Sequence, residues 1–188
     1  MHWKRTKGNA MLKRLAAIAV IILALGLQSC LSSAVGFNSY VDSYGGFRFL
    51  YPNGWVEISV PDGPDVVLHD IVEPSENLSV IINEVPDGQT LRDLGSPSEI
   101  GQKMAKRGLT ADKEASAELV TAGSRQTDEG EYYLLEYEVD LPGGVRHNLA
   151  SVIVRRGKLF TFSASTTDDR WATMEDRLRK VVSSFSVY

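Results

Sequence analysis

Cysteine is almost absent from this sequence, since Cys30 is the only one in 188 residues. A single thiol cannot form a disulfide within the chain, and it lacks the partner cysteines of a thiolate metal site. Histidine is also scarce, with three residues. No Gly-x-Ser-x-Gly elbow, phosphate-binding loop or His-Glu-x-x-His motif occurs, so an enzyme is not expected. A Ser-His-Asp arrangement assembled from distant positions stays open.

Basic residues are sparse once the amino-terminal segment is set aside. Residues 1–29 hold five Lys and Arg and no acidic residue, whereas the rest holds 15 Lys and Arg against 24 Asp and Glu. That balance argues against a nucleic-acid partner, because neutralising phosphates requires a basic face. With 43% hydrophobic and 23% charged residues, the chain has the composition of one globular domain.

The apolar run at residues 15–27 is shorter than the roughly 20 residues that span a bilayer. It follows two basic residues and ends at Leu27-Gln-Ser-Cys30, the order found in a bacterial lipoprotein signal. In that reading Cys30 is lipidated and begins the mature protein, held by several acyl chains because one chain alone binds membranes only marginally. The alternative is an ordinary secretory signal cut after Ala34. Translation from Met1 or from Met11 is equally open.

These features predict three segments. They are a lipoprotein signal peptide over residues 1–29, a lipidated tether over residues 30–38 and a folded domain over residues 39–188.

The domain carries strand patterns in two groups. Alternating or β-branched residues predict strands at 47–51, 55–60, 66–72 and 78–85, the last two forming a hairpin. Four more are predicted at 118–126, 132–140, 145–155 and 159–165. Short turns separate these four, so they should form an antiparallel meander.

Two helices are predicted. Ser96-Pro-Ser-Glu99 has the pattern of a capping box with proline in the first turn, and the helix should end near Arg107. The second helix follows Thr167 as N-cap. Its apolar residues recur at three- and four-residue steps and form one face: Trp171, Met174, Leu178, Val181, Val182 and Phe185.

Several short segments, in order, resemble the PsbP family, and most closely its cyanobacterial lipoprotein branch. They are Gly46-Phe-Arg-Phe-Leu-Tyr-Pro-Asn-Gly-Trp55, Glu76-Asn-Leu-Ser-Val80, Leu94-Gly-Ser-Pro-Ser-Glu99, Gly144-Val-Arg-His147, Arg156-Gly-Lys-Leu-Phe160, Asp169-Arg-Trp171 and Phe185-Ser-Val187. The resemblance covers residues 37–188. It implies an α+β fold, an α/β/α sandwich around a mostly antiparallel β-sheet.

The resemblance also implies a place and a role. The place is the lumenal face of the thylakoid membrane, and the partner is the photosystem II core or an assembly intermediate. The plant relatives support calcium and chloride retention and carry an extended amino-terminal arm without a lipid anchor. This sequence has a lipoprotein signal and a short tether instead, so intrinsic calcium is not expected. The implied role is that of a monomeric, lipid-anchored factor in photosystem II assembly or stability.

His147 and Asp168 match a family pair that is associated with divalent metal in plant relatives. A meander would bring the loop after Ser165 near the strand that begins at Val145, so the two side chains can converge. Imidazole and carboxylate suit zinc or manganese, although two ligands leave the other positions to water or a neighbouring chain. The alternative is that His147 packs at a sheet edge while Asp168 stabilises the start of its helix. No cofactor is required in either case, and any zinc or manganese would bind weakly.

Arg155, Arg156 and Lys158 form a basic cluster in an acidic domain. Such a cluster is usually a solvated hairpin tip, and docking onto acidic lumenal loops is the sharper alternative. The sequence therefore supports two functions. The first is a docking accessory protein of photosystem II, and the second is a lumenal module that binds a metal or small ligand at His147 and Asp168.

Overall fold

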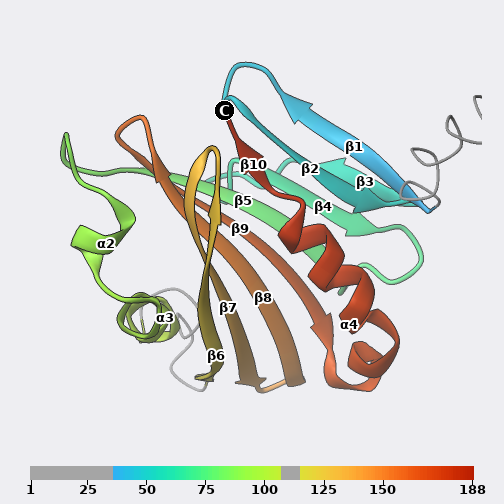
Figure 1. The fold of residues 1–188 in the computed structure, drawn as a ribbon. Helices are drawn as coiled ribbons and strands as arrows, with labels where there is room; N and C mark the ends of the chain where they lie inside the picture. The colour runs from blue at the N-terminus through green and yellow to red at the C-terminus, as the bar shows by residue number, and fades with distance from the viewer. Residues whose placement is uncertain (1–35, 107–114) are drawn as a thin grey trace, which may run out of the picture. The chain divides into compact units, whose positions relative to one another are not determined.

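The computed structural model describes residues 36–106 and 115–188, in which Phe37–Tyr188 belong to one structural unit (Figure 1). The described strands form two sheets. The small sheet has the order β1-β2-β10, and the large sheet has the order β3-β4-β5-β9-β8-β7-β6. Every strand pair is antiparallel. The strands are β1 (Phe37–Asp42), β2 (Phe47–Pro52), β3 (Trp55–Ile58), β4 (Val66–Asp70), β5 (Asn77–Glu84), β6 (Ser116–Thr127), β7 (Gly130–Leu141), β8 (Gly144–Arg155), β9 (Lys158–Thr167) and β10 (Ser186–Val187).

The predicted meander is confirmed as β6 to β9. The turn between β8 and β9 shows why consecutive strands of the meander pair with each other. Arg156 and Gly157 connect β8 to β9 with φ values of 53° and 70°. Two consecutive left-handed residues make the turn whose twist matches that of a hairpin, and glycine accepts this conformation without strain.

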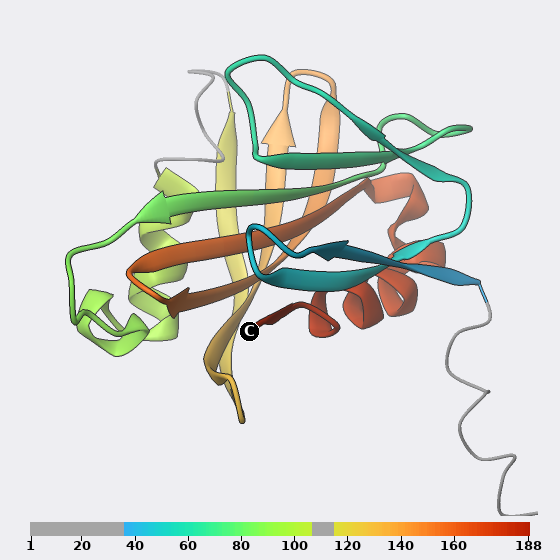
Figure 2. The same cartoon turned by 90° about the horizontal axis from the view of Figure 1, so that it is seen from above.

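The helices lie on opposite sides of the large sheet (Figure 1, Figure 2). Helix α4 (Asp168–Ser183) packs on β8 and β9 together with the small sheet, while α3 (Pro97–Met104) packs on β6 and β7, preceded by the short α2 (Leu91–Leu94). We call these two sides the α4 face and the α3 face. The sandwich of helix, sheet and helix is therefore confirmed.

Each face has its own hydrophobic core, as the two-residue period of a strand requires. On the α4 face Leu149 and Phe162 join a cluster with Leu178 and Phe185. On the α3 face Ala150 and Val152 join a second cluster with Ile100. The large sheet is thus buried on both sides along its centre, which explains why its middle strands are rich in apolar residues.

The helix ends agree only partly with the sequence patterns. Ser96 and Glu99 form the predicted capping box, with Glu99 Oε2 accepting from the Ser96 amide at 2.8 Å. Helix α3 ends at Met104, and the predicted end near Arg107 lies outside the described residues. Thr167 is the N-cap of α4, but its side chain makes no capping hydrogen bond.

Three features were not predicted. Strand β1 begins at Phe37, within the segment expected to be tether, and β10 at the chain end pairs with β2. Strand β2 belongs to the small sheet and β3 to the large sheet, so the first two strands predicted for the domain lie in different sheets. The signal peptide and Cys30 lie outside the described residues.

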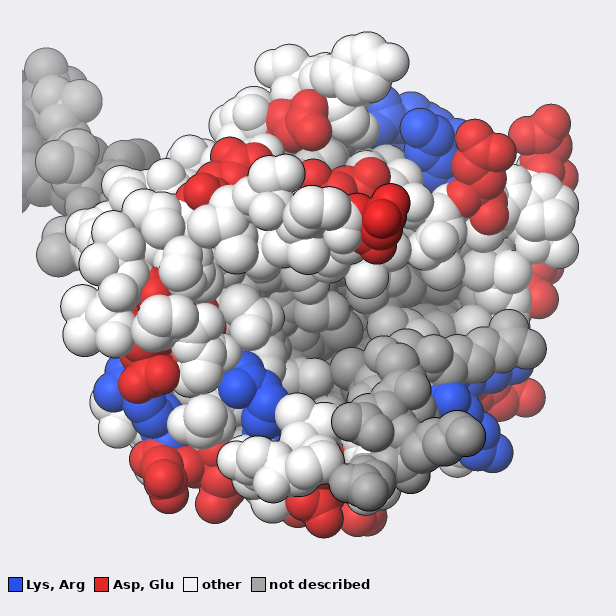
Figure 3. Space-filling view, turned by 180° about the vertical axis from the view of Figure 1, so that it is seen from behind, with Lys and Arg blue, Asp and Glu red and all other residues white. Residues whose placement is uncertain are grey.

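None of the described helices is both long and apolar enough to cross a membrane. The face seen from behind carries Lys and Arg in separate small groups among Asp and Glu (Figure 3). As far as its residues are described, that face offers no continuous basic field of the kind that a phosphate backbone needs.

Candidate functional site

His147 and Asp168 meet where β8 passes the start of α4. His147 Nε2 and Asp168 Oδ1 are 2.8 Å apart, and the imidazole stacks on Trp171 with ring centroids 4.5 Å apart. The His147 side chain is 10% exposed and that of Asp168 is 65% exposed. The topology therefore brings together the two residues that the sequence singled out, and it buries one of them under an aromatic ring.

This pair fits a hydrogen bond better than a bound ion. Donor atoms around a tetrahedral zinc with bonds near 2.1 Å are about 3.4 Å apart. The 2.8 Å separation is that of a direct hydrogen bond, so an ion would have to break it. Among residues 36–106 and 115–188, no group of three or more His, Cys, Asp or Glu side chains is arranged to hold a metal. Metal binding at His147 and Asp168 stays a prediction.

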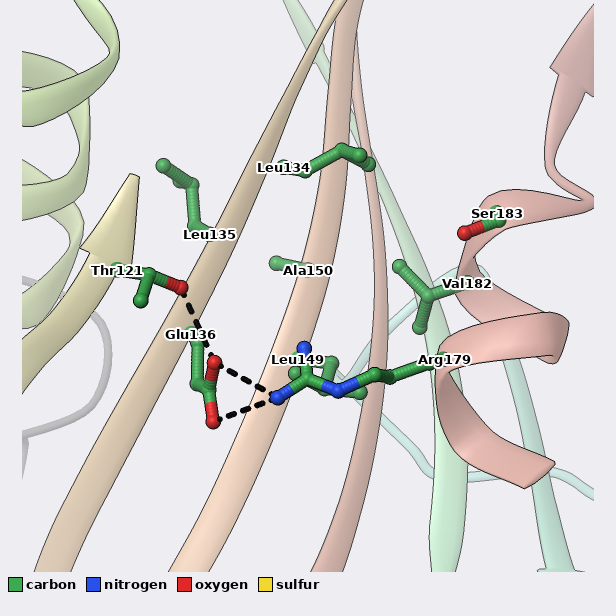
Figure 4. A pocket seen from close by; sticks show the side chains of 9 residues that line it. All are labelled: Thr121, Leu134, Leu135, Glu136, Leu149, Ala150, Arg179, Val182 and Ser183. Carbon is green, nitrogen blue, oxygen red and sulfur yellow. Dashed lines mark hydrogen bonds and ion pairs between the residues drawn. The ribbon is translucent and has the colours of Figure 1, made fainter. Parts of the chain in front are cut away.

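A pocket of about 270 Å³ opens on the α4 face beside this pair, between α4 and strands β6 and β7 (Figure 4). Arg179 reaches across from α4 to Glu136 on β7, while Thr121 approaches the same carboxylate from β6 (Figure 4). The pocket is lined by Thr121, Leu134, Leu135, Glu136, Leu149, Ala150, Arg179, Val182 and Ser183. Five of these nine residues are apolar, and the Glu136–Arg179 ion pair is part of the lining.

The Glu136 carboxylate and the Arg179 guanidinium both have more than one hydrogen-bond partner. Both Glu136 oxygens lie 3.0 Å from Arg179 Nη2, and Thr121 Oγ1 donates to Oε2 at 3.0 Å. Arg179 Nε also donates to Glu175 at 2.8 Å. Partial burial alone would lower the pKa of Arg179, but its hydrogen bonds with Glu175 and Glu136 raise that pKa above its ordinary value. The guanidinium thus stays charged and gives the buried Glu136 side chain an oppositely charged partner.

The His147 pair is linked to the pocket through Trp171. The Arg179 guanidinium lies 5.6 Å from the centre of the Trp171 ring, whose ring in turn stacks with His147. Within the described residues, the His147 hydrogen bond goes to a carboxylate and not to a hydroxyl or thiol. The arrangement is therefore an imidazole–carboxylate pair that is linked through an aromatic ring to an ion pair.

The basic cluster lies at the turn between β8 and β9. Arg156 donates to the carbonyl of Gly45 at 2.7 Å, and Arg155 donates to the carbonyl of Glu129. These bonds connect the turn to the hairpin tips of β1-β2 and β6-β7. Two of the three cations are thus engaged by backbone, while Lys158 is exposed.

Sequence reasoning missed Glu136, Arg179 and Thr121. The available signal was Glu136 itself, a charged residue within the run Tyr132-Tyr-Leu-Leu-Glu-Tyr137 of a central strand. A carboxylate at such a position needs a partner, but only the packed helix shows that the partner is Arg179.

Comparison with known proteins gives the family. The PsbP family model matches residues 35–187. CyanoP of Thermosynechococcus vestitus is 45% identical over 95% of this chain and 100% of its own length. PsbP-like protein 1, chloroplastic, of Arabidopsis thaliana is 33% identical over 86% of this chain and 69% of its own. The solution structure of cyanobacterial PsbP (CyanoP) from Synechocystis superposes with a TM-score of 0.72 at 44% identity, covering 87% of this chain and 99% of that one. The chain belongs to the PsbP family.

Proposed function

We propose that this protein is a lipid-anchored, non-enzymatic accessory protein on the lumenal side of the thylakoid membrane, which docks to photosystem II and supports its assembly or stability. The observation that carries the proposal is the match to the PsbP family and to CyanoP along nearly the whole chain. Cys30 at the end of a lipoprotein-type signal supplies the anchor. Confinement to the membrane surface raises the effective concentration of the domain near membrane-embedded partners.

The contact surface we favour is the end of the domain that carries the β8-β9 turn. Tyr44, at the tip of β1-β2, is fully exposed, and Tyr188 is 46% exposed. Arg156 and the Tyr188 amide both bond to this tip, through the carbonyls of Gly45 and Gly46. Lys158 adds an exposed cation. Tyrosine and arginine, both present at this end, are residue types enriched at protein interfaces.

Affinity purification from solubilised thylakoids tests the docking. Tagged protein should recover photosystem II subunits, and the variant Tyr44→Ser/Lys158→Glu should recover at least several-fold less. Arg177→Glu reverses a charge on the exposed side of α4 and serves as the matched control. Recovery that is unchanged in the double variant would move the interface elsewhere. Normal photosystem II accumulation and repair in a null strain would count against the function itself.

The convergence of His147 and Asp168 keeps the second function in view, a weak metal-binding module. Calorimetric titration of the protein with zinc, manganese and calcium separates the two functions. If His147→Ala/Asp168→Ala binds zinc or manganese as well as the unmodified chain does, this second function is wrong.

A further inference from the structure

Two adjacent aliphatic residues are strongly exposed at one end of the domain. Among the eight Val and Ile residues exposed in the described part, Val72 and Ile71 are the most exposed, at 89% and 61%. Val72 and Ile71 occupy the turn between β4 and β5. An isolated exposed aliphatic residue needs no explanation, but two adjacent ones at a protruding tip do.

The tip is held in shape by its own polar groups. Asp70 Oδ1 accepts from the amides of Val72 at 2.7 Å and Glu73 at 2.9 Å. The Ser75 hydroxyl donates to Glu73 at 2.6 Å, and Asn77 Nδ2 donates to the Ser75 carbonyl at 3.1 Å. These bonds give the turn a defined shape, and its exposed residues are Ile71, Val72 and Pro74.

Strand β1 begins at the same end of the domain (Figure 1). Phe37, the first residue of β1, pairs with Pro52 at the end of β2. The next turn, Asn53-Gly54, is bonded to the tip, because the Ile71 amide donates to the Gly54 carbonyl at 3.2 Å. Both ribbon views place the start of β1 and the β4-β5 turn at one end of the domain (Figure 1, Figure 2).

Chain length limits how far this end can be from a lipid on Cys30. Seven residue steps separate Cys30 from Phe37. At no more than about 3.6 Å per residue, Phe37 lies within about 25 Å of Cys30. The opposite end, with Tyr44 and the β8-β9 turn, lies a further strand length away, about 20 Å for the six residues of β1.

From these observations we propose that the Ile71-Val72 tip contacts the lipid bilayer beside the anchor and orients the domain with its β8-β9 end away from the membrane. The occupant is lipid, because an anchored Cys30 would hold this end close to the bilayer surface and the tip offers aliphatic side chains to it. A second contact also makes anchoring directional, since acyl chains on a short tether fix distance but not orientation. This inference rests on the proposed lipidation of Cys30.

Fluorescence from a labelled tip tests the contact. The full-length lipidated protein is placed on phosphatidylcholine vesicles with a minor share of phosphatidylglycerol, and an environment-sensitive dye is attached at Val72→Cys. The acylated Cys30 leaves the new thiol as the only one free to react. We expect emission to rise several-fold on the vesicles and to be quenched by spin-labelled lipid. The same dye at Tyr44→Cys, on the opposite end, should show neither change.

Three other outcomes overturn the proposal in different ways. A chain that does not float with the vesicles contradicts the lipid anchor, and the orientation falls with it. A chain that floats but shows water-like emission at residue 72 contradicts the orientation alone. Emission that changes only when photosystem II is added assigns the tip to a protein partner instead of lipid. As a second variant, Ile71→Asp carrying the dye at Val72→Cys should lose the quenching while still floating.

Discussion

At the scale of single residues, two glutamates are buried in this acidic domain, and each is held by an arginine from α4. Glu76 is 0% exposed, and its Oε1 accepts from Thr166 Oγ1 at 3.1 Å and from Arg170 Nε at 2.5 Å. Glu136 is 8% exposed and is held by Arg179. Buried carboxylates need such partners, so these pairs fix how α4 lies on the sheet.

The Glu136–Arg179 pair gives the first prediction. Arg179→Met should lower the free energy of unfolding by about 1–3 kcal/mol, because it leaves the Glu136 carboxylate buried with only Thr121 as partner. The double variant Arg179→Met/Glu136→Leu should recover much of that loss, since the uncompensated charge is gone. Urea unfolding measures both. A double variant less stable than Arg179→Met would show that the unpaired Glu136 side chain does not carry the expected penalty.

His147 gives the second prediction. His147→Ala should cost about 2 kcal/mol of unfolding free energy, because it removes both the stacking on Trp171 and the bond to Asp168. His147→Phe keeps the stacked ring and should restore part of the loss. Chemical denaturation of the three proteins tests this, with the exposed Asp169→Asn as control. If Phe is no better than Ala, the ring contributes little.

At the scale of elements, the sequence predicts those strands and helix ends that are determined by residues close together in the chain. The meander is marked by short turns and the start of α3 by a capping box, and both are found. Strand β10 is only two residues long, too short for any periodic pattern, and it pairs because Phe185 and Val187 are buried. The separation of β2 from β3 depends on packing at long range, which turn residues alone cannot specify.

The β4-β5 turn carries the third prediction, which concerns pH. Burial alone would raise the pKa of Asp70, but hydrogen bonds from the amides of Glu73 and Val72 lower it below its ordinary value. A carboxyl with a lowered pKa in the folded state adds stability above its unfolded pKa of about 3.9, and this is lost as pH falls through the folded value.

Asp70→Asn keeps an acceptor oxygen but cannot titrate. It should therefore be less stable than the unmodified chain above about pH 5, by about 0.5 kcal/mol once solvent screening is allowed for. The difference should shrink as pH falls below about 4. Unfolding curves across this range test it. A difference that is constant with pH would show that the charge on Asp70 plays no part.

At the scale of the whole molecule, the strands separate the two ends of the domain for which we propose different contacts. Strands β8 and β9 run between His147 and the Arg156 turn, so the metal candidates and the basic cluster lie at opposite ends of one hairpin. The proposed lipid contact is near the former end, because Arg146 beside His147 donates to the Ser75 carbonyl of the β4-β5 turn. The proposed docking and the proposed anchoring therefore use different ends of the domain and do not compete. The short segment between Cys30 and Phe37 would keep only the anchoring end near the membrane.

Phe185 contacts both sheets, so its substitution tests how much one side chain contributes to their attachment. It is 1% exposed and its ring lies 4.9 Å from Phe162 of the large sheet, 6.0 Å from Phe47 of the small sheet and 6.5 Å from Tyr132. Phe185→Ala should cost about 3–5 kcal/mol of unfolding free energy, because the cavity it leaves is bordered by both sheets. Tyr188→Ala, at a residue that is 46% exposed, should change stability by no more than about 0.5 kcal/mol.

Hydrogen exchange in native conditions then distinguishes a weaker attachment of the small sheet from a loss of stability of the whole domain. In Phe185→Ala, the opening that exposes the β2 amides to exchange should cost less free energy than the opening that exposes the β8 amides. The reason is that the small sheet has three strands and relies on Phe47 and Val187 for its attachment. Equal protection of β2 and β8 would mean that the two sheets open only together. In that case the β1-β2 tip that carries Tyr44 is as rigid as the large sheet, and a partner docking there would meet a preformed surface.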